Sequence, residues 1–238
     1  MSILFYSQPT GGFSDLYLSA RKKENRIFPD EQVAGLPNLE KNHIHYEEWQ
    51  LRKKSANRFM DYLKSKNKPL KILDIGCGNG WFSHLMSTLK NSEVTGLDVN
   101  TVEMEQAAGI FQKPNLTFVY ADLYENTELN SQKFDIIVFN SCFQYFENVG
   151  KLLGIVSKLL AENGEIHIID TPFYNSKNIE NAKQRTKDYY ADLGFSEMAK
   201  HYFHHRFQDL EKYKIMYKPS LFAKLLNNSP FCWIKIDA

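Results

Sequence analysis

A short apolar run that breaks into closely spaced glycines constrains the fold more than any other stretch. Residues 70–75 are mostly aliphatic, as in a parallel strand buried on both faces. Gly-Cys-Gly-Asn-Gly follows at 76–80, and apolar residues then recur with helical spacing from Phe82 to Leu89. We therefore expect a strand, a tight turn and a helix. Such a corner lets a nucleotide-like ligand approach the backbone and a helix N-terminus.

Strand and helix patterns alternate along the next hundred residues. Further strands are expected over 93–99, 116–120, 134–140 and 165–170. Helices are expected over 102–111 and 152–160, the second one stopped by Asn163-Gly164. Short strands that alternate with helices predict an α/β fold with a doubly wound, mostly parallel sheet.

The flanking segments are less regular. Residues 1–45 are expected to be an N-terminal extension, with a short strand near Ile3 to Tyr6 and a solvated charged run over 21–26. A helix is expected from Tyr46 to the residues before Asn67. After the fifth strand of this series, we expect a polar helix over 175–193, an aromatic and histidine-rich segment over 196–214, a helix capped by Ser220, and strands over 214–217 and 231–236.

Composition narrows the classes of partner. The net charge of +1 argues against a dedicated nucleic-acid binder, which needs a basic surface. No apolar run is long enough to span a bilayer or to form a signal-peptide core. The three cysteines are widely spaced, which argues against a disulfide framework or a thiolate zinc site. We expect a soluble protein of the cytoplasm.

Polar residues stand at the ends of four expected strands. They are Asp74, Asp98, Asp122 and Asn140. Because the carboxyl ends of parallel strands meet at one edge of a sheet, these side chains should converge there. A carboxylate at Asp98 can accept hydrogen bonds from both hydroxyls of a ribose, and Asp122 is placed to meet an adenine amino group.

This set resembles the class I S-adenosylmethionine-dependent methyltransferases, most closely the small-molecule group often called type 11. The resemblance rests on Asp74-x-Gly76-x-Gly78-x-Gly80, Asp98, Ala121-Asp122 and the strand that starts at Phe134, and it covers roughly 71–170. It implies a seven-stranded-type, Rossmann-like sheet and a methyltransferase domain over 46–238, with a substrate-cap insertion at 174–212.

The resemblance also implies roles for individual residues. Asp74 and Gly76 would face the methionine portion, with Cys77 as a small residue beside the cofactor. Gly78 and Gly80 would lie along the cofactor backbone. Asp98 would hold the ribose, Val99 and Leu123 would pack on the adenine next to Ala121, and Asp122 would bind its amino group. Asn140 would lie near the methionine end, and Gln144 or Tyr145 near the reacting methyl group.

Two alternatives share this ligand edge. A nicotinamide-binding domain requires glycine at the third glycine position of G-x-G-x-x-G, where this chain has Trp81. The pyrophosphate of a bound dinucleotide would also be repelled by Asp74. The second alternative is a non-catalytic cofactor-binding or scaffold module, which the intact acidic and glycine positions disfavour. We expect transfer of a methyl group from S-adenosyl-L-methionine, with S-adenosyl-L-homocysteine as the product.

The acceptor side is defined mainly by exclusion and by aromatic residues. Asn140-Ser141-Cys142-Phe143 lacks the Asn-Pro-Pro-Tyr type of motif used for nucleic-acid amino groups, so we expect O- or N-methylation of a small acceptor. His204, His205 and Tyr145 are the catalytic candidates, since histidine titrates near neutrality. His201 and His205 are four residues apart, but packing is favoured over a metal site and no metal is assigned. The substrate-wall candidates are Tyr46, Trp49, Gln144, Tyr174 and Tyr202, and a homodimer is left open.

Overall fold

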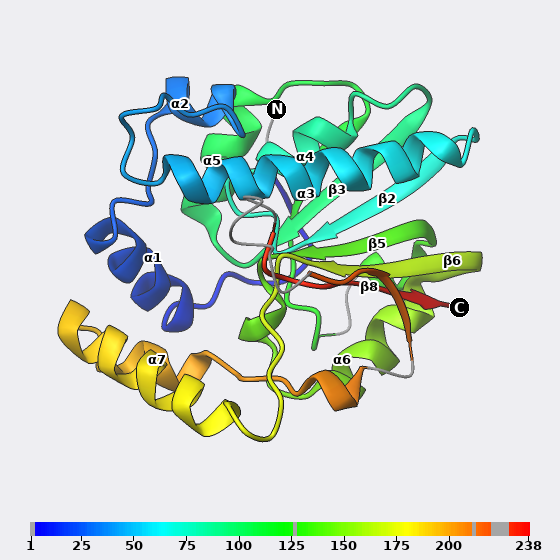
Figure 1. Cartoon of the computed structure of the whole chain (residues 1–238). Coiled ribbons are helices and arrows are strands. Elements are labelled where there is room, and N and C mark those ends of the chain that lie inside the picture. The colour runs from blue at the N-terminus through cyan, green and yellow to red at the C-terminus, as the bar shows by residue number, and fades with distance from the viewer. Residues whose placement is uncertain (1–2, 126–127, 211–212, 220–228) are drawn as a thin grey trace.

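An eight-stranded, mostly parallel sheet organises the chain (Figure 1). The computed structural model describes residues 3–125, 128–210, 213–219 and 229–238. The strand order is β1-β4-β3-β2-β5-β6-β8-β7. The strands are β1 (Leu4–Phe5), β2 (Leu70–Ile75), β3 (Ser92–Asp98), β4 (Leu116–Tyr120), β5 (Phe134–Asn140), β6 (Leu160–Ile169), β7 (Lys214–Tyr217) and β8 (Trp233–Asp237).

The predicted doubly wound sheet is confirmed. Strands β1 to β6 are parallel to their neighbours, and only β8 runs antiparallel, between β6 and β7. Strand β1 adds an eighth strand to the seven-stranded type, since it pairs with β4 at the edge of the sheet. The N-terminal 45 residues therefore contribute to the sheet, and Phe28 and Val33 lie buried in its core. A domain boundary at residue 45 stays a prediction.

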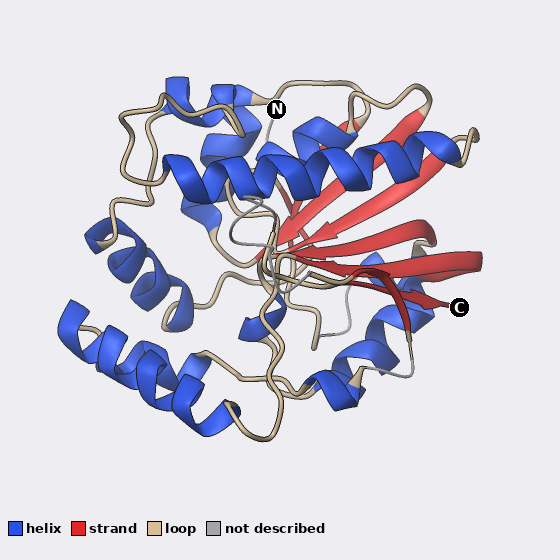
Figure 2. Cartoon of the chain, viewed as in Figure 1, coloured by secondary structure: helices blue, strands red, loops and turns tan. Residues whose placement is uncertain are grey.

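Helices cover both faces of the sheet (Figure 2). On one face, α3 (Tyr46–Ser65), α4 (Trp81–Met86) and α5 (Thr101–Ile110) share a core with side chains such as Ile72 and Val94. On the other face, α6 (Val149–Val156) packs against the alternate set, which includes Leu73 and Ile75. Side chains of successive strand residues point to opposite faces, so a strand that is apolar throughout is buried on both of them.

Two further helices lie side by side beyond the carboxyl ends of the strands (Figure 1). They are α1 (Phe13–Lys23) and α7 (Ile179–Leu193). Ala20 of α1 packs with Tyr190 of α7 and with Met198 of the 3₁₀ helix η4 (Ser196–His201). Helix α2 (Asp30–Gly35) packs near α5. Among the described residues, no helix is both long and apolar enough to cross a membrane.

The predicted helix over 152–160 was wrong at its carboxyl end. Helix α6 stops at Val156, a 3₁₀ turn covers 157–159, and β6 already begins at Leu160. Leu160 pairs with Phe134, and the register shifts before Glu165 pairs with Ile136. Asn163, with a φ of 60°, lies in this irregular part of the strand rather than at a helix end. The helix expected after Ser220 lies outside the described residues.

A buried polar network joins α3 to the far edge of β6 and β8. Glu165 accepts hydrogen bonds from Tyr62 (2.8 Å) and His167 (3.2 Å) and is ion-paired with Lys66 (2.7 Å) and Lys235 (3.2 Å). Although burial opposes ionisation, the hydrogen bonds from His167 and Lys66 hold the pKa of Glu165 well below its usual range. The network therefore stabilises the fold only while Glu165 is ionised.

Replacing Glu165 by Gln should lower the free energy of unfolding by roughly 1–3 kcal/mol at neutral pH, because Lys66 loses its ion pair and Lys235 keeps only the one with Asp237. The pKa is lowered on folding, so the stabilisation is present above the unfolded value of about 4.3 and is lost as the pH falls below it. Urea unfolding from neutral to acidic pH measures both effects. An equal loss of stability in wild type and E165Q on acidification would contradict this role.

Candidate active site

A cavity of about 300 Å³ lies at the carboxyl ends of β2, β3, β4 and β5. We call it the inner cavity. It brings together almost all of the predicted cofactor residues, namely Asp74, Gly76, Cys77, Gly78, Asp98, Val99, Ala121, Asp122, Leu123 and Asn140. The expected convergence of four strand ends therefore occurs in the fold.

Asp98 holds the glycine turn against the end of β3. Its carboxylate accepts backbone hydrogen bonds from Gly78 (2.8 Å), Val99 (2.7 Å) and Asn100 (2.9 Å). Burial raises the pKa of Asp98, and these three hydrogen bonds favour its ionised form. The side chain is thus fixed at the cavity wall, and a carboxylate has further lone pairs for a ligand.

Asp74 is a second carboxylate of the inner cavity and is only 1% exposed. It accepts a hydrogen bond of 2.6 Å from the hydroxyl of Ser83 in α4. Burial raises its pKa to about 7, and the nearby charge of Asp98 adds to the shift. A cationic group bound here would favour the ionised form.

The glycine turn serves two different purposes. Gly76 has a φ of 71°, and a Cβ there would lie 2.6 Å from the Cβ of Cys142. Gly80 has a φ of 74°, and a Cβ there would lie 2.7 Å from Ala107 and Phe118. Gly80 was predicted to lie along a cofactor, but in the described part of the chain it is not part of the cavity wall. Its missing side chain lets α4 and α5 pack closely.

A larger cavity of about 980 Å³ adjoins the first one. We call it the outer cavity. Five residues line both cavities and so mark the junction between them: Arg21, Arg26, Arg52, Ser141 and Tyr145. The outer wall is rich in tyrosine, with Tyr174, Tyr189, Tyr190 and Tyr202. An inner site that meets an outer site at one junction can hold two reactants in contact.

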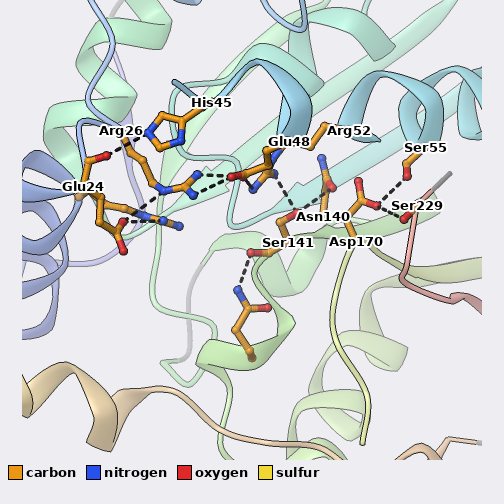
Figure 3. A network of polar contacts seen from close by, with 12 residues as sticks. Glu24, Arg26, His45, Glu48, Arg52, Ser55, Asn140, Ser141, Asp170 and Ser229 are labelled. Atoms are coloured by element: carbon orange, nitrogen blue, oxygen red, sulfur yellow. Dashed lines mark hydrogen bonds and ion pairs between the residues drawn. The ribbon is translucent and has the colours of Figure 1, made fainter. Parts of the chain in front are cut away.

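The junction arginines are tied into an ion-pair network (Figure 3). Two nitrogens of Arg26 donate to the two oxygens of Glu48, at 2.8 and 2.6 Å, and Arg52 donates to Glu48 at 2.9 Å. Arg52 also donates to the hydroxyl of Ser141 at 2.9 Å. Although burial opposes ionisation, the hydrogen bond from Arg26 and the charge of Arg52 lower the pKa of Glu48 to about 2.

Sequence reasoning missed Arg21 and Arg26. It expected a solvated charged run over 21–26, but Arg21 and Arg26 line both cavities because their ion pairs with Glu24 and Glu48 fold the segment over the strand ends. A run of mixed charges carries no signal that separates these roles. Asp170 and Ser141 were also missed, although the strand-end rule that found Asp98 could have found them.

The structure separates the predicted substrate and catalytic residues. Trp49 lines the inner cavity, Tyr145 lines both, and Gln144, Tyr174 and Tyr202 line the outer one. Tyr46 instead packs against the core, outside the described walls of both cavities.

His204 and His205 are not brought to either cavity wall within the described residues. The ring of His204 lies 2.9 Å from the hydroxyl of Thr186, and His205 is buried with Nε2 at 3.2 Å from the carbonyl of Phe143. Helix η4 ends at His201, so His201 and His205 do not share a helical face. The geometry favours packing for both His204 and His205 over the predicted catalysis.

The comparisons with known proteins agree with this geometry. Residues 66–219 match the family model described as "Methyltransferase domain", and the chain belongs to that family. It is 36% identical over 112 residues to a malonyl-[acyl-carrier protein] O-methyltransferase of Acetivibrio thermocellus, covering 46% of this chain and 38% of that protein. The chain thus spans less than half of that relative.

Two solved structures share the fold. The plantazolicin methyltransferase BpumL, in complex with SAH, has a TM-score of 0.56 at 21% identity and covers 93% of this chain and 94% of its own. The CurJ carbon methyltransferase has a TM-score of 0.62 at 16% identity and covers 91% and 61%. At these identities the likeness to both structures shows the fold alone.

Replacing Gly76 by Ala should lower stability by about 1–3 kcal/mol, since the φ is left-handed and the new Cβ would overlap Cys142. Gly109 is the matched control, because it lies in α5 with nothing within 4 Å of an added Cβ. Gly109→Ala should stabilise by roughly 0.5–1 kcal/mol. Thermal unfolding compares the two, and equal effects would contradict the assigned geometry.

Proposed function

We propose that this chain transfers a methyl group from S-adenosylmethionine to a small-molecule acceptor. The observation that carries the proposal is the inner cavity, where Asp74, Asp98 and Asp122 stand on adjacent strand ends around a glycine turn. The family match supports the same activity. Cytoplasmic location and a homodimer stay predictions.

The residues present fit the cofactor's chemistry. Asp98 offers a carboxylate for ribose hydroxyls, and Asp122 with Leu123 offers a polar and an apolar contact for an adenine. Asp74 suits an amino group. Trp49 lines the same cavity and is 5% exposed, yet its indole N–H has no partner among the described residues. This N–H would be a donor for the methionine carboxylate.

When bound, S-adenosylmethionine supplies an activated methyl group on a sulfonium. The chain must then align donor and acceptor and exclude water. The junction residues would do this. The arginine–glutamate network holds Ser141 in place through the hydrogen bond from Arg52. Tyr145 is held by packing against Phe13 and Tyr17 of α1, whose ring centroids lie 5.7 and 5.6 Å from its own. The acceptor would occupy the outer cavity, whose tyrosines suit an aromatic or partly apolar molecule.

S-adenosylhomocysteine and S-adenosylmethionine should raise the melting temperature, whereas NAD should not, because a ligand that binds only the folded state stabilises it. Asp98→Asn should weaken S-adenosylhomocysteine binding by about tenfold or more, since one of two ribose acceptors is replaced. Asp135→Asn is the control, because Asp135 lies at the opposite end of β5 and binds Lys68. Stabilisation by NAD and not by the two sulfur ligands would contradict the proposal.

The affinity for S-adenosylhomocysteine should rise between about pH 6 and pH 8, because Asp74 must be ionised to hold the amino group and its pKa lies near 7. Isothermal titration in buffers of different ionisation enthalpy should also detect proton release on binding. Asp74→Asn should remove the proton release. A proton release that persists in D74N would assign the titration to another group.

A further inference from the structure

The hydrogen-bond donors at the junction are already used. Arg21 is ion-paired with Glu24, and Arg26 and Arg52 are ion-paired with Glu48. Three further carboxylates, of Glu47, Asp188 and Asp192, stand exposed on the wall of the outer cavity. With Arg185, the described wall of the outer cavity carries four arginines against six carboxylates, so its charge is acidic overall and disfavours an anionic acceptor.

Gln144 leaves a buried hydrogen-bond acceptor without a partner. Its side chain is 7% exposed and lines the outer cavity. The amide nitrogen donates to the carbonyl of Ser141 at 2.7 Å, which fixes the orientation of the amide. The amide oxygen has no partner among the described residues. A buried polar atom without a partner is costly, and a ligand that donates to it would remove that cost.

Asp170 leaves a second acceptor free at the end of β6. Its Oδ1 accepts from Ser55 at 2.7 Å and from Ser229 at 3.2 Å, while Oδ2 has no hydrogen bond within the described parts of the chain (Figure 3). The residue lines the outer cavity. Burial raises its pKa, and the hydrogen bond from Ser55 offsets this only in part.

Both acceptors are held by the same strained strand ends. Ser141 follows β5 with a φ of 58°, and Asp170 follows β6 with a φ of 49°. The backbone N–H of Ser141 donates to the carbonyl of Ile169 at 3.1 Å, so the two left-handed residues lie on neighbouring strands. Left-handed non-glycine residues cost free energy and persist where the surrounding structure holds them, which is common at functional sites.

We propose that the acceptor is a primary or secondary amine, held by the amide oxygen of Gln144 and the carboxylate of Asp170, which takes its proton. This inference rests on the proposed function. The ammonium transfers a proton to Asp170, and the nitrogen lone pair then attacks the methyl carbon. The carbon–sulfur bond breaks with its electron pair going to sulfur, which leaves a neutral thioether and a methylated ammonium.

Two hydrogen-bond acceptors are unpaired in the outer cavity, and their number favours an amine over a hydroxyl as the group that is methylated. A primary or secondary ammonium can donate to both Gln144 and Asp170, whereas a hydroxyl can donate only one hydrogen bond. A substrate with a carboxylate in this place would bring only lone pairs toward the unpaired oxygens of Gln144 and Asp170. It would also be repelled by the charge of Asp170. The amine thus satisfies both groups.

Head-group preference can be measured without knowing the natural acceptor. Benzylamine, benzyl alcohol and benzoate carry the same ring, which suits the tyrosine-lined wall, and differ only in the polar group. With S-adenosylhomocysteine bound to the full chain, ligand-detected NMR should show benzylamine binding about tenfold tighter than benzoate. Tighter binding of benzoate, or no binding of benzylamine, would overturn the inference.

Asp170→Asn tests the residue itself. Asparagine tolerates the left-handed conformation and keeps an oxygen for Ser55 and Ser229, so the fold should persist. Benzylamine affinity should fall about tenfold in D170N and stay unchanged in D135N, which removes a carboxylate outside the described walls of both cavities. Equal benzylamine affinity in wild type and D170N would overturn the role of Asp170.

Binding of S-adenosylhomocysteine tests the proposed methyltransferase function independently of the amine acceptor. Wild type, D170N and D135N should all bind it with the same affinity, because Asp170 and Asp135 lie outside the described wall of the inner cavity. Loss of this binding in wild type would refute the proposed function. Retained binding with the wrong head-group preference would refute the amine inference alone.

Discussion

The carboxylate of Asp98 is the point on which the architecture of the site depends. It joins the glycine turn after β2 to the end of β3 through three backbone hydrogen bonds. The turn is left-handed at Gly76, Gly78 and Gly80, a conformation that glycine adopts readily. The N–H groups of Gly76 and Cys77 donate to the carbonyl of Leu97 in β3, and that of Gly78 donates to Asp98. The Asp98 carboxylate thus helps to hold the turn and provides part of the binding surface.

The N-terminal segment and α7 form much of the wall of the outer cavity, which adjoins the inner one. The N-terminal segment reaches the strand ends through Arg21 and Arg26, whose ion pairs with Glu24 and Glu48 connect it to α3. Helix α7 provides the opposite wall through Tyr189 and Tyr190. Two segments far apart in sequence therefore form one tyrosine-rich cavity, the outer cavity. Its ability to bind polar groups depends on which arginine N–H groups are left free by the ion pairs.

The parts of the fold that follow from local pattern were predictable from the sequence. The apolar runs gave β2, β4 and β5 nearly to the residue, and the strand-end rule placed Asp74, Asp98 and Asp122 at one site. Pattern failed where tertiary pairing competes with local signals. Asn163-Gly164 resembles a helix stop, yet pairing of Leu160 with Phe134 starts β6 earlier.

Ion pairs between residues far apart in the chain could not be predicted from the sequence either. Arg26 and Glu48 are 22 residues apart, and the ion pair that holds Arg26 at the junction forms only because the chain folds back on itself. The His204-His205 pair lay outside the strand-end rule: His204 lies beside the hydroxyl of Thr186 and His205 beside the carbonyl of Phe143, and a catalytic role for either stays a prediction. Chemistry-bearing residues are informative mainly when the topology forces them to one edge.

A crystal structure of the protein grown with S-adenosylhomocysteine tests the central claim most directly. We expect the ribose hydroxyls within hydrogen-bond distance of Asp98, the amino group beside Asp74, and the sulfur directed toward the junction of the two cavities. A nucleoside bound away from Asp98, or a sulfur directed away from the outer cavity, would contradict the account.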